Sequence, residues 1–221
     1  MTGRVMVKGV AVGYESTLER DYLIFMNWHR GVSHVDGQPV TIRYRNAEGR
    51  MTSYTPDFLT TYLDGSRQLA EVKYRADLKE LWADYRPRFR QGVRWAASQS
   101  AGGQATRFKI MTDTEIRTDY LRNARFLSGY IGDDPEPGIE DQLAATLVTM
   151  GETTPKALLE AAFRHPVNRV AAIRPMWRMI GLGRIEFDMN AALTMASAIW
   201  IIAGEGFVPP GYHGYDLGGT P

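Results

Sequence analysis

Tyr54-Thr-Pro-Asp-Phe-Leu59, followed by Leu69-Ala-Glu-Val-Lys73, is the most informative feature of the sequence. Glu71 and Lys73 are two residues apart, and residues two apart in a β-strand point to the same face of the sheet. A hairpin between the two segments would bring Asp57 beside them. Two carboxylates can hold a divalent metal ion through oxygen, and a neighbouring lysine supplies a positive charge or a proton relay. The pattern is therefore typical of metal-dependent phosphodiester cleavage.

A solvent-exposed strand with glutamate and lysine at alternate positions is the alternative interpretation of these residues. Apolar residues flank the acids, however, among them Phe58, Leu69 and Val72. Strands with such neighbours are expected to face a core rather than solvent alone. The predicted order of helix, three strands and helix around them also supplies an α/β framework for a site. We therefore favour the catalytic interpretation.

The composition restricts the metal and the compartment. The chain has no cysteine, which excludes disulfides and cysteine-bound zinc. Its four histidines show no metal-ligand spacing, so oxygen ligands should dominate and Mg²⁺ is favoured, with Mn²⁺ as a substitute. The sequence has no apolar run of the length that a membrane span needs, and no signal-peptide layout at its N-terminus. We therefore expect a cytoplasmic protein with no membrane partner.

Hydrophobic periodicity predicts mixed α/β structure in the first part of the chain. Helices are expected at 16–29 and 119–127, and over 78–98, where Pro87 should end or kink the helix. The Asp64-Gly65 pair is a strong hairpin signal. The expected strands lie at 40–45, 54–63, 68–74 and 108–111. This order predicts a sheet with flanking helices.

The segment Gly132-Asp-Asp-Pro-Glu-Pro-Gly138 has the composition of a linker. Beyond it helices are predicted at 139–150, from Thr154 onward, and from Pro166 towards Gly181 with a kink at Pro175. A small hairpin of 184–187 with 198–202 should follow, and three helices with a hairpin describe a winged helix. The predicted organisation is a catalytic domain at 1–131, a linker at 132–138, a winged-helix domain at 139–203 and a flexible Gly/Pro-rich tail at 204–221.

Two clusters of arginines lie in stretches without any acid. The net charge is only +1, so a surface for nucleic acid would need its positive charge segregated. A charge run is usually a solvated face, and the first cluster fits that interpretation as well as DNA binding. Arginine is well suited to phosphate, and DNA binding is favoured for the second cluster, which falls on the third helix and the wing. The first cluster is Arg86, Arg88, Arg90 and Arg94, and the second is Arg164, Arg169, Arg174, Arg178 and Arg184.

Ser16-Thr-Leu-Glu19 opens the first predicted helix and fits the capping-box pattern S-x-x-E. In such a box the glutamate closes the helix N-terminus through a hydrogen bond to the backbone. From the residues alone, Glu19 is better explained as a cap than as a catalytic acid.

Taken in order, these motifs resemble those of TnsA, the endonuclease subunit of heteromeric cut-and-paste transposases. The resemblance covers most of the chain, and its ordered set of motifs is more specific than any one of them. The matching residues are Ser16-x-x-Glu19, Tyr54-Thr-Pro-Asp-Phe-Leu59, Glu71-Val-Lys73, Thr112-Asp-Thr-Glu-Ile-Arg117, Asn123, Leu127, Gly183-Arg-Ile-Glu-Phe-Asp188 and Leu193-Thr194.

The resemblance implies a restriction-endonuclease-like core joined to a winged-helix domain. It implies that Glu19, Asp57, Glu71 and Lys73 form the active site, and it thereby reverses the interpretation of Glu19 as only a cap. Some TnsA proteins carry glutamine at the position of Glu71. The substrate implied is double-stranded DNA at transposon ends, cut on the 5′ strands that the TnsB-type partner transposase does not join. A contact with a regulatory AAA+ ATPase is an analogy only.

Two other functions remain open at this point. The first is a standalone restriction or repair nuclease of the same fold, for which the winged helix and the tail would be unnecessary. The second is a DNA-binding adaptor whose nuclease core is inactive, against which the intact set of Asp57, Glu71 and Lys73 argues.

Overall fold

The structure is a computed structural model that describes residues 2–201. Within these residues the chain forms two compact units, 2–117 and 118–201, and each is described by itself. The tail predicted at 204–221 lies outside the described residues. Among the helices of the described part, none combines the length and the apolar character that a membrane crossing requires.

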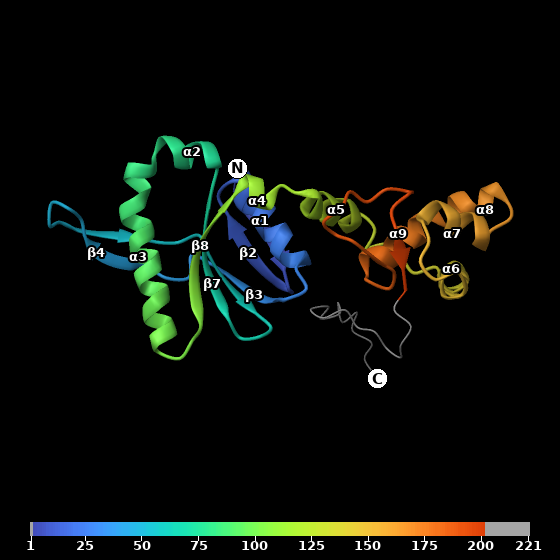
Figure 1. The fold of residues 1–221 in the computed structure, drawn as a ribbon, viewed down its shortest axis with the longest axis horizontal. Coiled ribbons are helices and arrows are strands. Elements are labelled where there is room, and N and C mark those ends of the chain that lie inside the picture. Colours follow the sequence, from blue (N-terminus) through green and yellow to red (C-terminus); the bar gives the residue numbers. More distant parts are fainter. Residues whose placement is uncertain (1, 202–221) are drawn as a thin grey trace. The chain divides into compact units, whose positions relative to one another are not determined.

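The first unit has mixed α/β structure, as the sequence predicts (Figure 1). The predicted strand at 108–111 and the predicted hairpin around Asp64-Gly65 are confirmed. Its elements are β1 (Gly3–Val7), β2 (Val10–Tyr14), α1 (Thr17–Trp28), β3 (Val32–Gly37), β4 (Ile42–Arg45), β5 (Met51–Tyr54), β6 (Phe58–Tyr62), β7 (Arg67–Lys73), α2 (Arg75–Glu80), α3 (Trp82–Ala101), β8 (Thr106–Thr112) and α4 (Asp113–Ile116).

The central sheet has four strands in the order β3-β6-β7-β8. The pairs β3–β6 and β6–β7 are antiparallel, whereas β7 and β8 are parallel. Parallel neighbours need a crossover connection, and here α2 and α3 supply it. Strands β1 and β2 form one separate antiparallel pair, and β4 and β5 form another. The sequence did not predict β1, β2 or β3.

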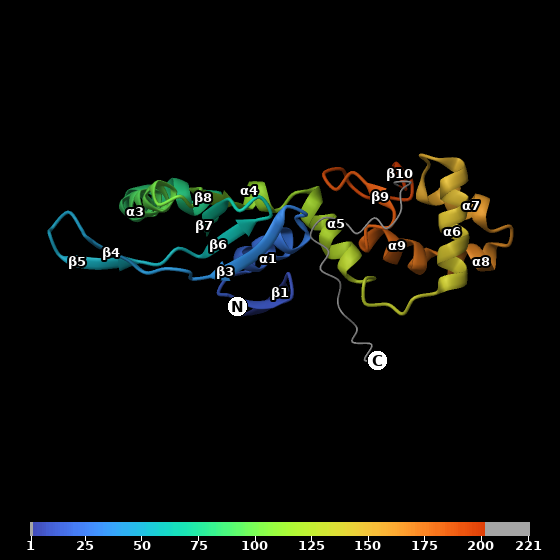
Figure 2. The same ribbon diagram turned by 90° about the horizontal axis from the view of Figure 1, so that it is seen from below.

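The register of the strands shows that α1 and α3 cover opposite faces of this sheet. Tyr22 of α1 stacks on Phe58, with ring centroids 5.1 Å apart. On α3, Phe89 contacts Phe108 of β8, with centroids 5.9 Å apart. Phe108 pairs with Leu69, whereas Phe58 pairs with Ala70, the next residue of β7. Since successive residues point to opposite faces, the two helices lie on either side, and Figure 2 gives the view along the sheet.

An ion pair between a buried aspartate of α1 and the partly exposed Arg117, which follows α4, links α1 to the end of the first unit. Asp21 is only 1% exposed and accepts a hydrogen bond of 2.8 Å from Nε of Arg117. Arg117 also donates to the hydroxyl of Tyr74 at 3.1 Å, and that hydroxyl lies 3.0 Å from Oγ1 of Thr17. Tyr74 directly follows Lys73, so the network sets the N-terminal end of α1 against the end of β7.

The second unit contains helices followed by a short antiparallel strand pair. The predicted helix at 119–127 is confirmed as α5, and helices and hairpin follow in the predicted order. Their assignment as a winged helix stays a prediction. The elements are α5 (Asp119–Ser128), α6 (Pro137–Met150), α7 (Pro155–Ala162), α8 (Pro166–Ala171), α9 (Ile173–Gly181), β9 (Glu186–Phe187) and β10 (Ile199–Trp200).

Three boundaries differ from those expected. The units divide between Arg117 and Thr118 rather than at 132–138, because α5 packs on α9 through Phe126 and Trp177, whose rings are 5.2 Å apart. The predicted third helix is broken into α8 and α9 at Ala172 instead of kinking at Pro175. A proline clashes with the carbonyl four residues earlier, which places the break upstream of the proline itself. Likewise the helix expected over 78–98 is interrupted at Leu81, and Pro87 lies inside α3.

Helix α3 can approach the sheet closely because Gly92 faces Phe108. A Cβ atom at position 92 would lie 2.6 Å from Cε2 of Phe108. We expect Gly92→Ala to lower the free energy of unfolding by about 1–3 kcal/mol through overpacking, despite the gain in helix propensity of about 1 kcal/mol. Urea denaturation followed by circular dichroism measures this change.

The matched control is Gly138→Ala in α6, where an added Cβ would meet nothing within 4 Å. This variant should be neutral or stabilised by up to about 1 kcal/mol. If Gly92→Ala were as stable as the Gly138→Ala variant, the close packing of α3 on β8 would be wrong.

Candidate active site

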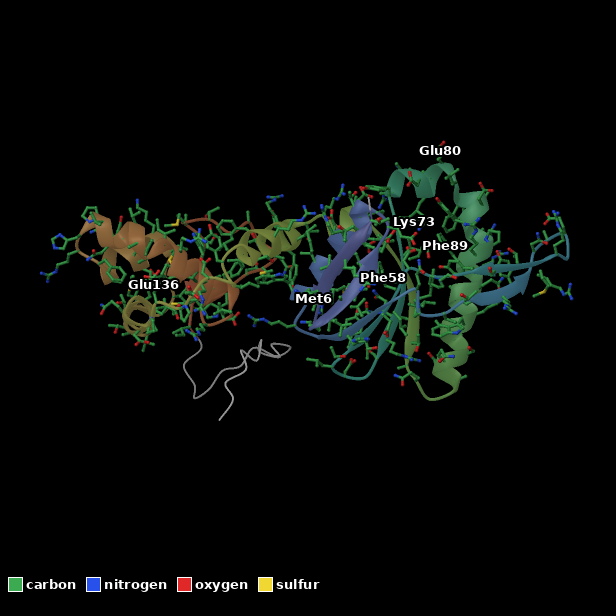
Figure 3. The ribbon with its side chains drawn as sticks, turned by 180° about the vertical axis from the view of Figure 1, so that it is seen from behind. Met6, Phe58, Lys73, Glu80, Phe89 and Glu136 are labelled. Atoms are coloured by element: carbon green, nitrogen blue, oxygen red, sulfur yellow. The ribbon has the colours of Figure 1, made fainter. Side chains whose placement is uncertain are left out.

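Asp57, Glu71 and Lys73 meet at one end of the central sheet, as the strand spacing predicts. Asp57 immediately precedes β6, and Glu71 and Lys73 occupy alternate positions on β7. Glu71 lies two residues beyond Leu69 and so shares the face that α3 covers. Figure 3 labels Lys73 on β7 and Phe89 on α3, the helix that covers this face of the sheet.

The two carboxylates are joined by the ammonium group of Lys73. Nζ of Lys73 lies 2.9 Å from Oε1 of Glu71 and 3.4 Å from Oδ2 of Asp57. The backbone N–H of Val72 donates to the same Oδ2 at 2.7 Å. Nζ also donates to the carbonyl of Val72 at 3.1 Å. Residues 71–73 therefore fix the position of Asp57 through both a backbone and a side-chain contact.

Tyr54 is a member of the site whose role the sequence did not reveal. It is the last residue of β5 and is 6% exposed. Its hydroxyl donates to Oε2 of Glu71 at 2.6 Å, so both oxygens of this carboxylate are held. Burial, together with the charge of Glu71, raises the pKa of Tyr54 far above its usual value. The hydroxyl therefore stays protonated and remains a hydrogen-bond donor. In the sequence, only the position of Tyr54, three residues before Asp57, indicated a place in the site.

The electrostatics of the site are those of two crowded acids. Burial and the charge of Glu71 raise the pKa of Asp57 to about 7, although Lys73 and the Val72 N–H act in the opposite direction. Burial by itself would lower the pKa of Lys73, but the two carboxylates outweigh burial and raise the pKa above 10.5. At neutral pH Lys73 is therefore an ammonium ion, and Asp57 takes up a proton more readily than an ordinary aspartate.

Ser16 forms the helix cap that the S-x-x-E pattern predicts, whereas Glu19 bonds to the residue before the cap and not to the N–H of Ser16. Oγ of Ser16 accepts from the Glu19 N–H at 3.1 Å, and Oε2 of Glu19 accepts from the N–H of Glu15 at 2.7 Å. Glu19 nevertheless lies near enough to Asp57 for its charge to contribute to the raised pKa of Asp57. The structure thus places Glu19 beside the site without bringing it into contact with the other three residues.

The donor set fits a hard divalent cation. Asp57 and Glu71 are oxygen donors, which Mg²⁺ prefers, and their mutual repulsion, visible in the raised pKa of Asp57, is what a cation would relieve. Only Oδ2 of Asp57 is engaged by residues of the described part of the chain. In residues 2–201 no group of three or more His, Asp or Glu side chains is arranged to hold a metal. A metal would therefore be held chiefly by the Asp57 and Glu71 pair, with Glu19 moving away from the Glu15 N–H if it takes part.

The first arginine cluster lies on α3 and is exposed. Arg86, Arg90 and Arg94 follow one another at intervals of four residues and so share one side of the helix. Arg88 points elsewhere, and its charge acts on Tyr54. No ion pair within the described residues engages these side chains, so they keep the features expected of a phosphate-binding surface.

Four of the five arginines of the second cluster, by contrast, have partners within their own unit, although the stretch itself contains no acid. Arg178 and Arg184 donate to the two oxygens of Glu140 at 2.7 and 2.6 Å, and Glu140 is 3% exposed. Arg174 makes two hydrogen bonds to Asp133, of 3.1 and 2.9 Å.

Arg169 is the fourth of these arginines and also has a structural contact. Its Nε donates to the carbonyl of Phe163 at 2.7 Å, and Nη2 donates to that of Arg164 at 3.1 Å. These carbonyls lie at the C-terminal end of α7, where backbone oxygens lack helical partners. The four arginines thus hold their unit together, and DNA binding by them stays a prediction.

One comparison with known proteins matches a part of the first unit. Residues 29–113 match the family model described as TnsA-like endonuclease N terminal. The match runs from the residue after α1 into the start of α4 and includes Asp57, Glu71 and Lys73, whereas Glu19 and the second unit lie outside it. It supports a TnsA-type endonuclease of the restriction-endonuclease-like superfamily. None of the curated proteins searched matches the chain.

The raised pKa of Asp57 predicts a pH-dependent cost to stability. The unfolded chain ionises Asp57 near 3.8, whereas the folded chain does so near 7. The contribution of protonated Asp57 to the free energy of unfolding is therefore fully present below about pH 4 and is lost as the pH rises through 7. Asp57→Asn keeps an acceptor for the Val72 N–H and removes this loss. In EDTA it should be more stable than wild type at pH 8, and the advantage should shrink by on the order of 2 kcal/mol at pH 5.

Thermal unfolding at the two pH values checks this expectation. The matched control is Asp84→Asn, which alters an exposed carboxylate in the first turn of α3. Its effect should be the same at pH 5 and pH 8. An equal effect of Asp57→Asn at both pH values would show that the two acids are not crowded as described.

Proposed function

We propose that this chain, which carries a TnsA-like endonuclease domain over residues 29–113, is the DNA endonuclease subunit of a heteromeric transposase. The observation that carries the proposal is the pair of carboxylates of Asp57 and Glu71, bridged by Lys73 at 3.4 and 2.9 Å. The proposed reaction is hydrolysis of the 5′, non-transferred strands at transposon ends. A TnsB-type transposase would act on the other strands, and a regulatory AAA+ ATPase is a further proposed partner.

The chain's own groups divide the proposed work between them. Asp57 and Glu71 would hold Mg²⁺, or Mn²⁺ in its place, with Glu19 joining directly or through water. When bound, the ion would supply an acidified water and positive charge beside the scissile phosphate. Tyr54 and the Val72 N–H keep the two carboxylates in place as the substrate arrives.

The contacts of Lys73 favour one of its two possible roles. Its ammonium group bridges the two carboxylates, and its N–H groups can also position a water molecule or a phosphate oxygen. Lys73 therefore acts in the proposed mechanism as a cation that orients the nucleophile and offsets charge. The proton of the water would pass to solvent or to a phosphate oxygen.

Nicking of plasmid DNA that carries the transposon ends tests the proposal. We expect cleavage with Mg²⁺ or Mn²⁺ and the partner transposase, and none in EDTA. Asp57→Ala, Glu71→Ala and Lys73→Ala should each lower the rate by on the order of 10²-fold or more. Their affinity for DNA should change little, because the variants remove charge at the reacting centre rather than the surrounding arginines.

The control is Asp36→Ala, which removes an exposed carboxylate at the end of β3 and should leave cleavage unchanged. Cleavage by Lys73→Ala at the wild-type rate would contradict the assigned site. Asp57-dependent cleavage without any partner would instead establish a standalone nuclease. Absence of cleavage under all conditions would favour an inactive DNA-binding adaptor.

Tyr54→Phe tests the positioning role of the tyrosine hydroxyl. The variant removes only the 2.6 Å hydrogen bond to Glu71 and leaves the ring in place. Loss of an outer hydrogen bond of this kind commonly weakens metal binding by about 10- to 100-fold. We therefore expect the Mg²⁺ concentration for half-maximal nicking to rise about tenfold, with a smaller change in the rate at saturating Mg²⁺.

Tyr44→Phe, on the same strand pair, is the matched control. It should leave the Mg²⁺ dependence as in wild type. A Tyr54→Phe variant that has the same Mg²⁺ dependence but a lower melting temperature would assign Tyr54 a purely structural role.

A further inference from the structure

The strands β4 and β5 form a ribbon that stands apart from the central sheet. They pair with each other over four residues each, and within residues 2–201 they pair with no other strand. Figures 1 and 2 both show the ribbon reaching out beside α3, with its turn well beyond the helix. Apart from the buried Tyr54 at its base, the ribbon lies outside the hydrophobic core. Its exposed residues are therefore expected to suit a binding partner and not core packing.

The two faces of the ribbon differ in exposure. Ile42 pairs with Tyr54, and Tyr44 pairs with Thr52; these four residues are buried or half-buried. The opposite face carries Arg43, Arg45, Met51 and Ser53, all of them exposed. One face thus packs towards the protein, and the other is presented to solvent along the whole length of the strands.

The exposed face and the turn are basic. Between Gln38 and Pro56 the chain has three arginines and one acid, Glu48. Arg45 donates from Nη1 to the carbonyl of Gly49 at 2.9 Å. Arg43 and Arg50 make no ion pair with any residue of the described part. The net positive charge is therefore available to an anionic partner.

The turn of the ribbon is held in a defined shape. The N–H of Asn46 donates to the carbonyl of Arg50 at 3.0 Å, and the N–H of Arg50 donates to Oδ1 of Asn46 at 2.9 Å. Gly49 has a φ of 75°, which favours glycine. An arm with a defined shape loses less conformational entropy on binding than a mobile loop.

The ribbon is joined directly to the candidate active site. Strand β5 ends at Tyr54, whose hydroxyl holds Glu71, and Asp57 follows three residues later. At about 3.4 Å per residue, the four residues of each strand and the turn reach roughly 15–20 Å from Tyr54. That length is about half a turn of B-form DNA, and a two-stranded β-ribbon fits the major groove.

We propose that the β4–β5 ribbon binds the DNA duplex beside the cut site. Arg50, at the turn, would contact a backbone phosphate about half a helical turn from the scissile phosphate, and Arg43, nearer Tyr54, would contact a phosphate closer to it. This inference rests on the proposed function, because it takes DNA as the substrate. Positive charge, a single acid and an exposed, mostly polar face favour DNA over a protein surface as the occupant.

Binding to a fluorescein-labelled 40-base-pair duplex tests the ribbon independently of cleavage. Every variant carries Asp57→Ala, so that no cutting occurs. Arg43→Glu should weaken binding by about tenfold at 50 mM NaCl and lower the dependence of log Kd on log salt by about one. The matched control is Arg4→Glu, which reverses the charge of an exposed arginine on the β1–β2 pair. This variant should bind the duplex as tightly as the protein that carries Asp57→Ala alone.

A second readout locates the arm on the DNA. The chain has no cysteine, so Glu48→Cys places a single thiol at the turn of the ribbon, and Val10→Cys places one on the β1–β2 pair. An iron–EDTA group tethered at position 48 should cut the duplex, whereas the same group at position 10 should not.

The outcomes separate the two proposals. Weakened binding by Arg43→Glu together with DNA cuts from position 48 supports the ribbon, even if the wild-type chain never nicks DNA and the proposed function fails. Equal DNA binding by the Arg43→Glu and Arg4→Glu variants, or absence of cuts from position 48, would show that the ribbon does not bind DNA. Normal nicking by the wild-type chain in that case would still support the proposed function. Weaker capture of the partner transposase by Arg43→Glu, with unchanged DNA binding, would assign the ribbon to protein contact instead.

Discussion

The repulsion between the carboxylates of Asp57 and Glu71 is the constraint on which the site depends. Two neighbouring carboxyl groups are costly to ionise together. The Val72 N–H, the Tyr54 hydroxyl and the ammonium of Lys73 hold these two next to each other. The register of β6 and β7 and the crossover through α3 set these groups in place. The fold therefore maintains an arrangement that is unfavourable in itself. Such local destabilisation is common at the functional sites of proteins.

The parts of the site that follow from strand periodicity could be predicted from the sequence. Glu71 and Lys73 had to share a face, and the Asp64-Gly65 turn brought Asp57 next to them, because both effects act over a few residues. The role of Tyr54 could not be predicted in this way. It depends on a strand pair that leaves the central sheet and returns, and no local pattern specifies where such an arm ends. The cap at Ser16 was predictable for the opposite reason, since its partner is three residues away.

The arginines show the same limit of local reasoning. Stretches without acids suggested unpaired charge, yet the partners of Arg174, Arg178 and Arg184 lie 38 to 44 residues earlier in the chain. Long-range pairing of this kind is set by helix packing and not by neighbours in sequence. On α3 the arginines do remain without an ion pair among the described residues. Local charge counting thus succeeded only where the fold supplied no distant acid.

The hydrogen bond between Tyr54 and Glu71 has a thermodynamic consequence. One side chain belongs both to the end of the β4–β5 arm and to the carboxylate pair. Any ligand that shifts the arm must also shift the energy of Glu71, and a cation on Glu71 must act back on the arm. Linkage requires the two effects to be equal. Through the Tyr54 hydroxyl, binding of nucleic acid to the arm and binding of a cation to Glu71 would then be cooperative, each changing the affinity for the other by the same factor.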